Sequence, residues 1–169
     1  GDPGPVIYGQ LRIGKNGKAF KMWKFRSMYK NADKMIDQLT DEQRQQYITE
    51  FKIDNDPRIT PVGNFLRKTS LDELPQLFNV LCNDMSLVGP RPLIESEIQT
   101  YYADMFDTLL SVKPGVTGYW QAYARNNATY QSGQRQQMEM YYVNHASIML
   151  DIKILFRTVA SVLRRDGAK

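Results

Sequence analysis

The sequence predicts a single α/β domain, in which a small antiparallel sheet with an N-terminal hairpin is surrounded by helices. Three observations lead to this fold class. The chain has 169 residues, enough for one substantial hydrophobic core and too few for two independent domains, so we assign one domain to residues 1–169. Two β-rich runs flank an Asn-Gly pair near the N-terminus, and amphipathic helical patterns fill much of the remaining chain.

The composition is that of a folded protein with a mild excess of positive charge. Hydrophobic residues make up 42% and charged residues 24% of the chain, which excludes a disordered or fibrous protein. The 22 Lys and Arg residues exceed the 18 Asp and Glu residues, for a net charge of +4. This excess favours anionic partners and leaves nucleic acid, phosphate ligands and membrane surfaces open.

The N-terminal hairpin is predicted from the segment VIYGQLRIGKNGKAFKMWKFRSM. Its central pair, Asn16 and Gly17, is the strongest short signal for a two-residue turn, which sets Lys24 opposite Gly9. Alternation along the second strand places Lys24 and Arg26 on the same face. Two cations then point the same way beside an open patch, although a solvated strand end would give the same pattern.

Helical patterns follow the hairpin. Residues 31–51 predict two amphipathic helices, the second opened by a capping box of Thr40 and Gln43. The segment LPQLFNVL predicts a buried helix, and DMSLVGPRP predicts a short extended run that enters a stiff loop around Arg91. A turn and a further short β-like run are predicted from VKPGVTGYWQ.

The chain closes with a helical pattern over residues 148–163. Its apolar residues cover a broad face, and Lys153, Arg157 and Arg164 form a narrow basic stripe. Such a helix either belongs to the core with a charged edge or lies at a membrane interface. The sequence has no apolar run of about eighteen residues, so no segment is expected to span a bilayer.

Cys82 and His145 are each single in the sequence. One cysteine excludes a disulfide framework within the chain and is typical of a reducing compartment. A lone histidine is more often a structural or surface imidazole than a base, so neither residue is assigned chemistry. The opening GDPGPV has no initiating Met and no signal-peptide features, and we expect the chain to be a fragment.

The most informative stretch, RKTSLDELPQ, places Asp72 next to Glu73. In one interpretation Ser70 and Glu73 form a capping box, and Asp72 favours the positive end of the helix dipole. Pro75 has no amide for the first helical turn, so that turn is expected to be irregular or kinked.

In the second interpretation the two acids meet a phosphate ligand and its divalent cation. Carboxylates repel an unscreened pyrophosphate, so this role requires several cations nearby. The chain offers Lys24, Arg26, Arg67, Arg91 and Arg125. The prolines on both sides of Arg91 reduce the entropy of holding its guanidinium in place, which suits an oxyanion clamp and equally suits a rigid turn.

Four segments together resemble the bacterial sugar transferase family: KFRSM, DPRITPVGNFLRKTSLDELPQLFNVLCNDMSLVGPRP, KPGVTGYWQ and YYVNHASIMLDIKILFRTV. The similarity covers residues 4–162. Members are monotopic polyprenyl-phosphate phosphoglycosyl transferases. The resemblance therefore implies transfer of a sugar-1-phosphate from a nucleotide diphospho-sugar, generally a UDP-sugar, to a polyprenyl phosphate. It also implies Mg2+ as cofactor, a role in starting surface-glycan or exopolysaccharide synthesis, and a position at the cytoplasmic face of the bacterial inner membrane.

The same resemblance implies roles for individual residues. Asp72 falls on the nucleophile that forms a sugar-phosphoryl-aspartate, and Glu73 falls on the acid that helps to hold Mg2+. The substrate-binding positions fall on Lys24, Arg67, Arg91 and Arg125, with Asp151 at the rim of the site, and Arg26 joins them from the hairpin pattern. The arrangement agrees with covalent catalysis between two large anions, in which a metal neutralises charge on the attacked phosphoryl group.

The sequence departs from the family pattern before GPVIYGQ, where the family has an apolar re-entrant membrane helix. Its absence from the sequence agrees with the expected fragment, and the domain is expected to sit peripherally on the membrane. The alternative function is a non-catalytic basic module that binds phospholipid or nucleic acid, with steep salt dependence and no turnover. The transferase itself is expected to have a nucleotide sugar, a polyprenyl phosphate and the membrane surface as partners, and no nucleic acid.

Overall fold

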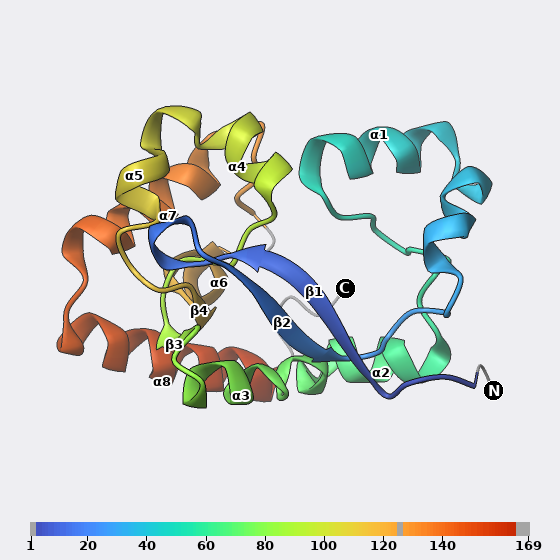
Figure 1. The fold of residues 1–169 in the computed structure, drawn as a ribbon, viewed down its shortest axis with the longest axis horizontal. Coiled ribbons are helices and arrows are strands. Elements are labelled where there is room, and N and C mark those ends of the chain that lie inside the picture. The colour runs from blue at the N-terminus through green and yellow to red at the C-terminus, as the bar shows by residue number, and fades with distance from the viewer. Residues whose placement is uncertain (1–2, 125–126, 165–169) are drawn as a thin grey trace.

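The computed structural model describes residues 3–124 and 127–164 and confirms the α/β class (Figure 1). In chain order its strands and α-helices are β1 (Ile7–Ile13), β2 (Ala19–Phe25), α1 (Asp41–Glu50), α2 (Pro61–Lys68), α3 (Gln76–Leu81), β3 (Ser86–Val88), α4 (Glu95–Tyr101), α5 (Phe106–Leu109), β4 (Gly115–Thr117), α6 (Tyr119–Ala124), α7 (Gln134–His145) and α8 (Ile148–Arg164). Short 3-10 helices span Lys15–Gly17, Ala32–Gln38, Leu71–Glu73 and Ala103–Met105.

The predicted antiparallel hairpin forms from β1 and β2, but its predicted register is wrong. Lys24 lies opposite Tyr8, and Gly9 lies opposite Trp23. The turn is longer than two residues because residues 14–18 connect the strands through a 3-10 helix, in which Asn16 and Gly17 both have positive φ. The Asn16 amide donates to the carbonyl of Leu110 at 2.8 Å, so a distant segment holds the turn. The expected open patch at Gly9 is filled by the side chains of β2.

A second sheet pairs β3 with β4 in parallel, whereas only antiparallel pairing was predicted. The two strands are separated in the chain by α4 and α5, and such a crossover is what parallel pairing requires. Gly89 and Gly115 allow the close approach, since a Cβ at Gly115 would lie 2.1 Å from the Gly89 nitrogen. β3 runs directly into the loop that carries Arg91.

The segment before α2 is less regular than predicted. The first of the two expected amphipathic helices is a 3-10 helix, Ala32–Gln38. The second is α1, and its predicted capping box of Thr40 and Gln43 is confirmed. α1 has no fully buried residue, so it contributes little to the core.

Three buried apolar clusters connect the sheets to the helices. The first combines residues around α4 and α5 with one residue before α7: Leu93, Ile98, Tyr102, Leu109, Leu110 and Tyr130. The second joins Phe20 and Met22 of β2 to Met85, and the third joins β3 to α7 and α8 through Val88, Tyr142 and Ile154. Lys24 follows Phe20 and Met22 on the same face of β2, so this buried face leads toward the candidate site.

The predicted burial of α3 is inverted. Gln76 and Asn79 are buried, whereas Phe78 and Leu81 are 64% and 81% exposed. The cause is the Asn79 side chain, which accepts from the Trp23 amide at 3.0 Å and donates to the Lys21 carbonyl at 2.9 Å. These hydrogen bonds pair backbone groups at the free edge of β2 and turn the apolar side of α3 outward.

Three helices, α2, α3 and α8, run along the lower edge of the molecule in Figure 1, and each exposes large apolar side chains. We call these side chains, together with Leu74 just before α3, the apolar edge: Val62, Phe65, Leu74, Leu77, Phe78, Leu81, Ile148, Met149, Ile152, Phe156 and Val159. Over residues 148–162 of α8, Ile154 is buried, while Phe156 is 76% exposed. This helix is therefore in part a core helix and in part a surface one. The described helices include none that is both long and apolar enough to cross a membrane.

Candidate active site

Asp72 and Glu73 lie on the short 3-10 helix between α2 and α3. The capping box of Ser70 and Glu73 is not formed, because Ser70 has the left-handed conformation with φ 58 and its side chain makes no cap hydrogen bond. Pro75 is the N-cap of a separate helix, α3, which confirms the predicted irregular turn. Asp72 and Glu73 therefore do not cap a continuous helix.

Lys24 reaches this turn from β2. Its Nζ donates to Glu73 Oε1 at 2.9 Å, and both side chains are partly exposed. Asp72 beside them is only 8% exposed. Burial raises the pKa of Asp72, and the charge of Glu73 raises it further, while Lys24 and Arg67 act in the opposite direction. The site thus combines one buried carboxylate with one that is paired to a cation.

Arg67 lies in the last turn of α2, and Ser27 fixes its direction. Arg67 Nε donates to Ser27 Oγ at 2.9 Å. The Ser27 carbonyl in turn accepts from the Thr60 amide at 3.0 Å, and Gly63 packs so closely that a Cβ there would lie 1.9 Å from that carbonyl oxygen. Burial lowers the pKa of Arg67, with Asp72 among the charges that oppose the shift. Arg67 is therefore close enough to Asp72 to affect its charge.

Arg91 follows β3 in the loop with Pro90 and Pro92. Its Nε is buried without a hydrogen-bond partner. Burial lowers the pKa of Arg91, but the neighbouring groups Glu97, Tyr130 and Glu73 act in the opposite direction, and the pKa is raised. Glu73 is thus one of the charges that act on the Arg91 guanidinium, whose Cζ lies 6.0 Å from the centroid of the Trp120 ring.

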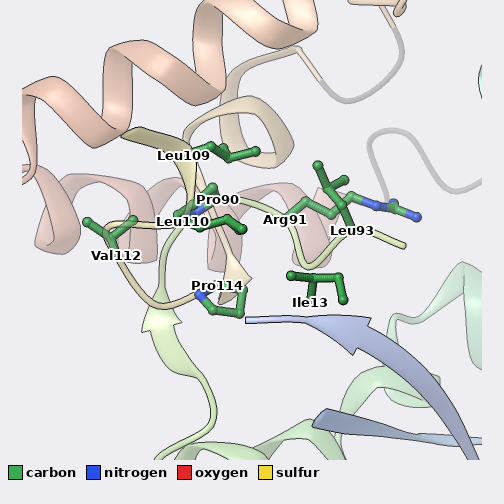
Figure 2. Close-up of a pocket in the computed structure, with 8 residues that line it drawn as sticks. All are labelled: Ile13, Pro90, Arg91, Leu93, Leu109, Leu110, Val112 and Pro114. Atoms are coloured by element: carbon green, nitrogen blue, oxygen red, sulfur yellow. The ribbon is translucent and has the colours of Figure 1, made fainter. Parts of the chain in front are cut away.

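Figure 2 shows an apolar pocket beside this loop, lined by Ile13, Pro90, Arg91, Leu93, Leu109, Leu110, Val112 and Pro114. The Arg91 side chain extends past Leu93, and its guanidinium lies beyond the apolar lining. The pocket itself therefore offers little to a charged ligand, and the polar end of Arg91 points elsewhere.

The remaining predicted residues are placed differently. The Arg26 guanidinium lies against Gly4, where a Cβ would be 3.0 Å from its Nη1. Asp151 on α8 accepts a hydrogen bond from the Tyr142 hydroxyl at 2.8 Å, which ties α8 to α7. Arg125 lies outside the described residues. The substrate-binding roles of these three residues stay predictions.

A buried group of charged residues behind Arg91 was not predicted. Arg12 donates to Glu97 at 3.2 Å, and Arg135 lies between the rings of Trp120 and Tyr130, with its Cζ 4.0 Å and 3.9 Å from the two ring centroids. Glu139 is also buried. The segment MEMYY, which sets an acid among apolar residues, was the available signal.

The short 3-10 helix thus carries a buried carboxylate and a second acid, with Lys24 and Arg67 acting on them from separate elements. Paired acids with cations from separate elements form a class of site that can handle phosphorylated substrates. Consistent with that class, the sequence matches the bacterial sugar transferase family over residues 1–165. The chain belongs to this family.

Several curated relatives have high identity to this chain. Undecaprenyl-phosphate galactose phosphotransferase of Salmonella typhimurium is 50% identical over 99% of this chain and 35% of its own length. UDP-glucose:undecaprenyl-phosphate glucose-1-phosphate transferase of Escherichia coli is 43% identical over 93% of this chain and 32% of its own length. Exopolysaccharide production protein ExoY of Rhizobium meliloti is 40% identical over 99% of this chain and 74% of its own length. The chain thus spans about a third of the length of the first two of these relatives.

Proposed function

We propose that this chain is the catalytic domain of a sugar phosphotransferase that moves a sugar-1-phosphate from a UDP-sugar to a polyprenyl phosphate in exopolysaccharide or capsule synthesis. The observation that carries the proposal is the buried Asp72, next to the Lys24–Glu73 ion pair and within electrostatic range of Arg67. The names of the relatives from Salmonella typhimurium and Escherichia coli support both the lipid acceptor and the transferred group.

In the proposed reaction an Asp72 carboxylate oxygen attacks the phosphorus that carries the sugar. The bond from this phosphorus to the bridging oxygen breaks, and UMP leaves with the electron pair. A phosphate oxygen of the polyprenyl phosphate then attacks the same phosphorus. The aspartyl bond breaks, the carboxylate of Asp72 is restored, and the lipid diphospho-sugar is the product. Each step exchanges one P–O bond for another, so no oxidant or reductant is needed.

Each basic side chain would neutralise part of the negative charge of the donor diphosphate. Arg67 and Arg91 have planar guanidinium groups that can bind two phosphate oxygens at once, whereas Lys24 is a point charge that can move between Glu73 and a substrate oxygen. Because Asp72 is buried, it carries little hydration when it attacks. Lys24 and Arg67 oppose the increase in its pKa that burial causes.

The residues present fit a magnesium ion bound together with substrate. Among the described residues no group of three or more His, Cys, Asp or Glu side chains is arranged to hold a metal. Mg2+ commonly takes only one or two protein carboxylates and completes its shell with water and substrate phosphates. Glu73 would supply the carboxylate, and the bound ion would neutralise phosphate charge.

We further propose that the apolar edge rests on the cytoplasmic surface of the inner membrane, where the acceptor resides. Isolated exposed apolar residues are normal on soluble proteins, but a contiguous apolar surface is typical of an interaction site. On α8 the exposed Lys153 and Arg157 accompany the apolar side chains, which suits contact with anionic lipid head groups.

The decisive test is turnover. The protein is incubated with a panel of UDP-sugars, polyprenyl phosphate and Mg2+, and release of UMP is measured. Release that requires both the lipid and one particular sugar supports the proposal and identifies the donor. Salt-sensitive binding to lipid or nucleic acid without any release of UMP would instead support the non-catalytic module.

A further inference from the structure

The tip of the loop between β3 and α4, residues 90–92, has one backbone hydrogen-bond donor. Pro90 and Pro92 have no amide hydrogen, which leaves the N–H of Arg91. This amide donates to both carboxylate oxygens of Glu139 on α7, with N···O distances of 3.2 Å and 3.4 Å. The Pro90 carbonyl accepts from the Gly115 amide of β4 at 2.9 Å. Two separate elements therefore hold the backbone that carries the Arg91 side chain.

Glu139 is only 2% exposed. Burial raises its pKa to about 7, while Arg135 and Arg91 act in the opposite direction. In the described part of the chain, the charged or titratable groups that interact with it are Arg135 from its own helix, Arg91 from the loop, and Tyr102 next to α4. A glutamine could accept from the same amide without the cost of burying a charge. The charge of Glu139 also acts on the Arg91 guanidinium, whose pKa it raises.

Arg135 offsets the charge of Glu139 without competing for its oxygens. Its guanidinium is held between Trp120 and Tyr130, and its Nε and Nη2 are buried without hydrogen-bond partners. Within the described residues, the hydrogen bonds of the Glu139 carboxylate go to the Arg91 amide. Arg135 and Arg91 thus oppose the protonation that burial favours, and the carboxyl group of Glu139 remains directed at the loop tip.

We propose that Glu139 is a positioning residue for Arg91, which it holds so that the guanidinium faces the Asp72–Glu73 pair and binds a diphosphate. This inference rests on the phosphate-binding role given to Arg91 in the proposed function. Glu139 itself does not touch the substrate. It acts through the backbone of Arg91 and through the electrostatic attraction between its carboxylate and the guanidinium.

The variant Glu139→Gln keeps the size of the side chain and one acceptor for the amide, and it removes the charge. We expect UDP affinity, measured by calorimetry, to fall about tenfold, with a matching rise in KM for the sugar donor and no fall in melting temperature. Glu50→Gln is the control, because Glu50 on α1 also accepts from a backbone amide, that of Tyr130 at 3.0 Å, and should leave UDP affinity unchanged.

A double variant tests whether Glu139 affects UDP binding through Arg91. In an Arg91→Ala background, Glu139→Gln should cause no further loss of UDP affinity, because the residue it positions is gone. The inference would be overturned if Glu139→Gln caused an equal loss of UDP affinity in both backgrounds. It would also be overturned if Glu139→Gln bound UDP like the wild type, or if a drop in its melting temperature accounted for the whole loss. UDP binding that follows these expectations without turnover of any donor would count against the proposed reaction and leave the positioning role standing. A wild-type protein that does not bind UDP would overturn both.

Discussion

The change Asp72→Asn separates the two interpretations of the paired acids most sharply. It keeps the shape of the side chain and an oxygen acceptor, and it removes the negative charge. An amide is a very poor nucleophile, so no sugar-phosphate should become attached to the variant, while binding of the donor persists. The catalytic interpretation therefore predicts loss of chemistry without loss of the fold.

The stability of this variant has a predicted sign. Burial raises the pKa of Asp72 above its usual value of 3.8, so the folded state favours the protonated form. The free energy of unfolding then declines as pH rises from the unfolded pKa through the higher folded pKa, and stays at the lower level above it. Asparagine cannot ionise and avoids this penalty. At pH 7 the melting temperature of Asp72→Asn should equal or exceed that of the wild type, and the difference should vanish in acid.

A capping role predicts the opposite sign. Loss of a helix cap costs about 0.5–2 kcal/mol, which corresponds to a melting temperature lower by about 1–8 °C in a domain of this size. The left-handed Ser70 makes no cap bond, so the structure gives no reason to expect that loss.

Two measurements decide between these outcomes. Mass spectrometry after incubation with donor detects a sugar-phosphate on the protein, and thermal unfolding at pH 7 reports stability. Full turnover in Asp72→Asn would end the catalytic interpretation outright. A melting temperature several degrees below that of the wild type would refute the assignment of Asp72 as a destabilising buried charge.

Three further predictions concern the arginine loop, the metal and the membrane. Arg91→Lys should reduce turnover about tenfold to a thousandfold, because lysine cannot hold two phosphate oxygens in one plane; turnover near that of the wild type would make the loop a structural turn. Glu73→Gln should cut turnover and its dependence on Mg2+ with little change in melting temperature, since its partly exposed ion pair with Lys24 is worth at most about 1 kcal/mol; intact metal dependence would exclude Glu73 as ligand. Phe156→Glu should weaken binding to anionic liposomes at high salt, whereas Ile48→Glu on α1, also exposed, should not; equal binding by both variants would contradict the membrane role of the apolar edge.

The existence of the hairpin could be predicted from the sequence, but its register could not. Alternation and the Asn-Gly pair are local signals, and they correctly indicated two strands and a reversal. The turn length depends on the bond from the Asn16 amide to the Leu110 carbonyl, and no local pattern contains that contact. The same limit applies to β3 and β4, whose parallel pairing depends on the path of the intervening chain.

The orientation of α3 could not be predicted from hydropathy. Hydropathy indicates only which residue types are usually buried, and it does not include a hydrogen bond to a particular strand. In this helix Asn79 takes the inner position by binding the edge of β2, and the leucines face outward. The candidate site shows a similar division. The types of residue around Asp72 could be read from the sequence, whereas Glu139 acts on Arg91 through a backbone amide and left only the weak signal of an acid in an apolar run.

The width of α3 also bears on the distance between Asp72 and a membrane surface. Its outward side carries Phe78 and Leu81, and its inward side binds the strand that bears Lys24. An α-helix with its side chains is about 10–12 Å across. If the apolar edge rests on a bilayer, Asp72, just before this helix, stands no more than about one helix diameter above the hydrocarbon boundary. A lipid phosphate could then react while its chain stays dissolved among the other acyl chains, and the protein would need no tunnel to enclose a long polyprenyl tail.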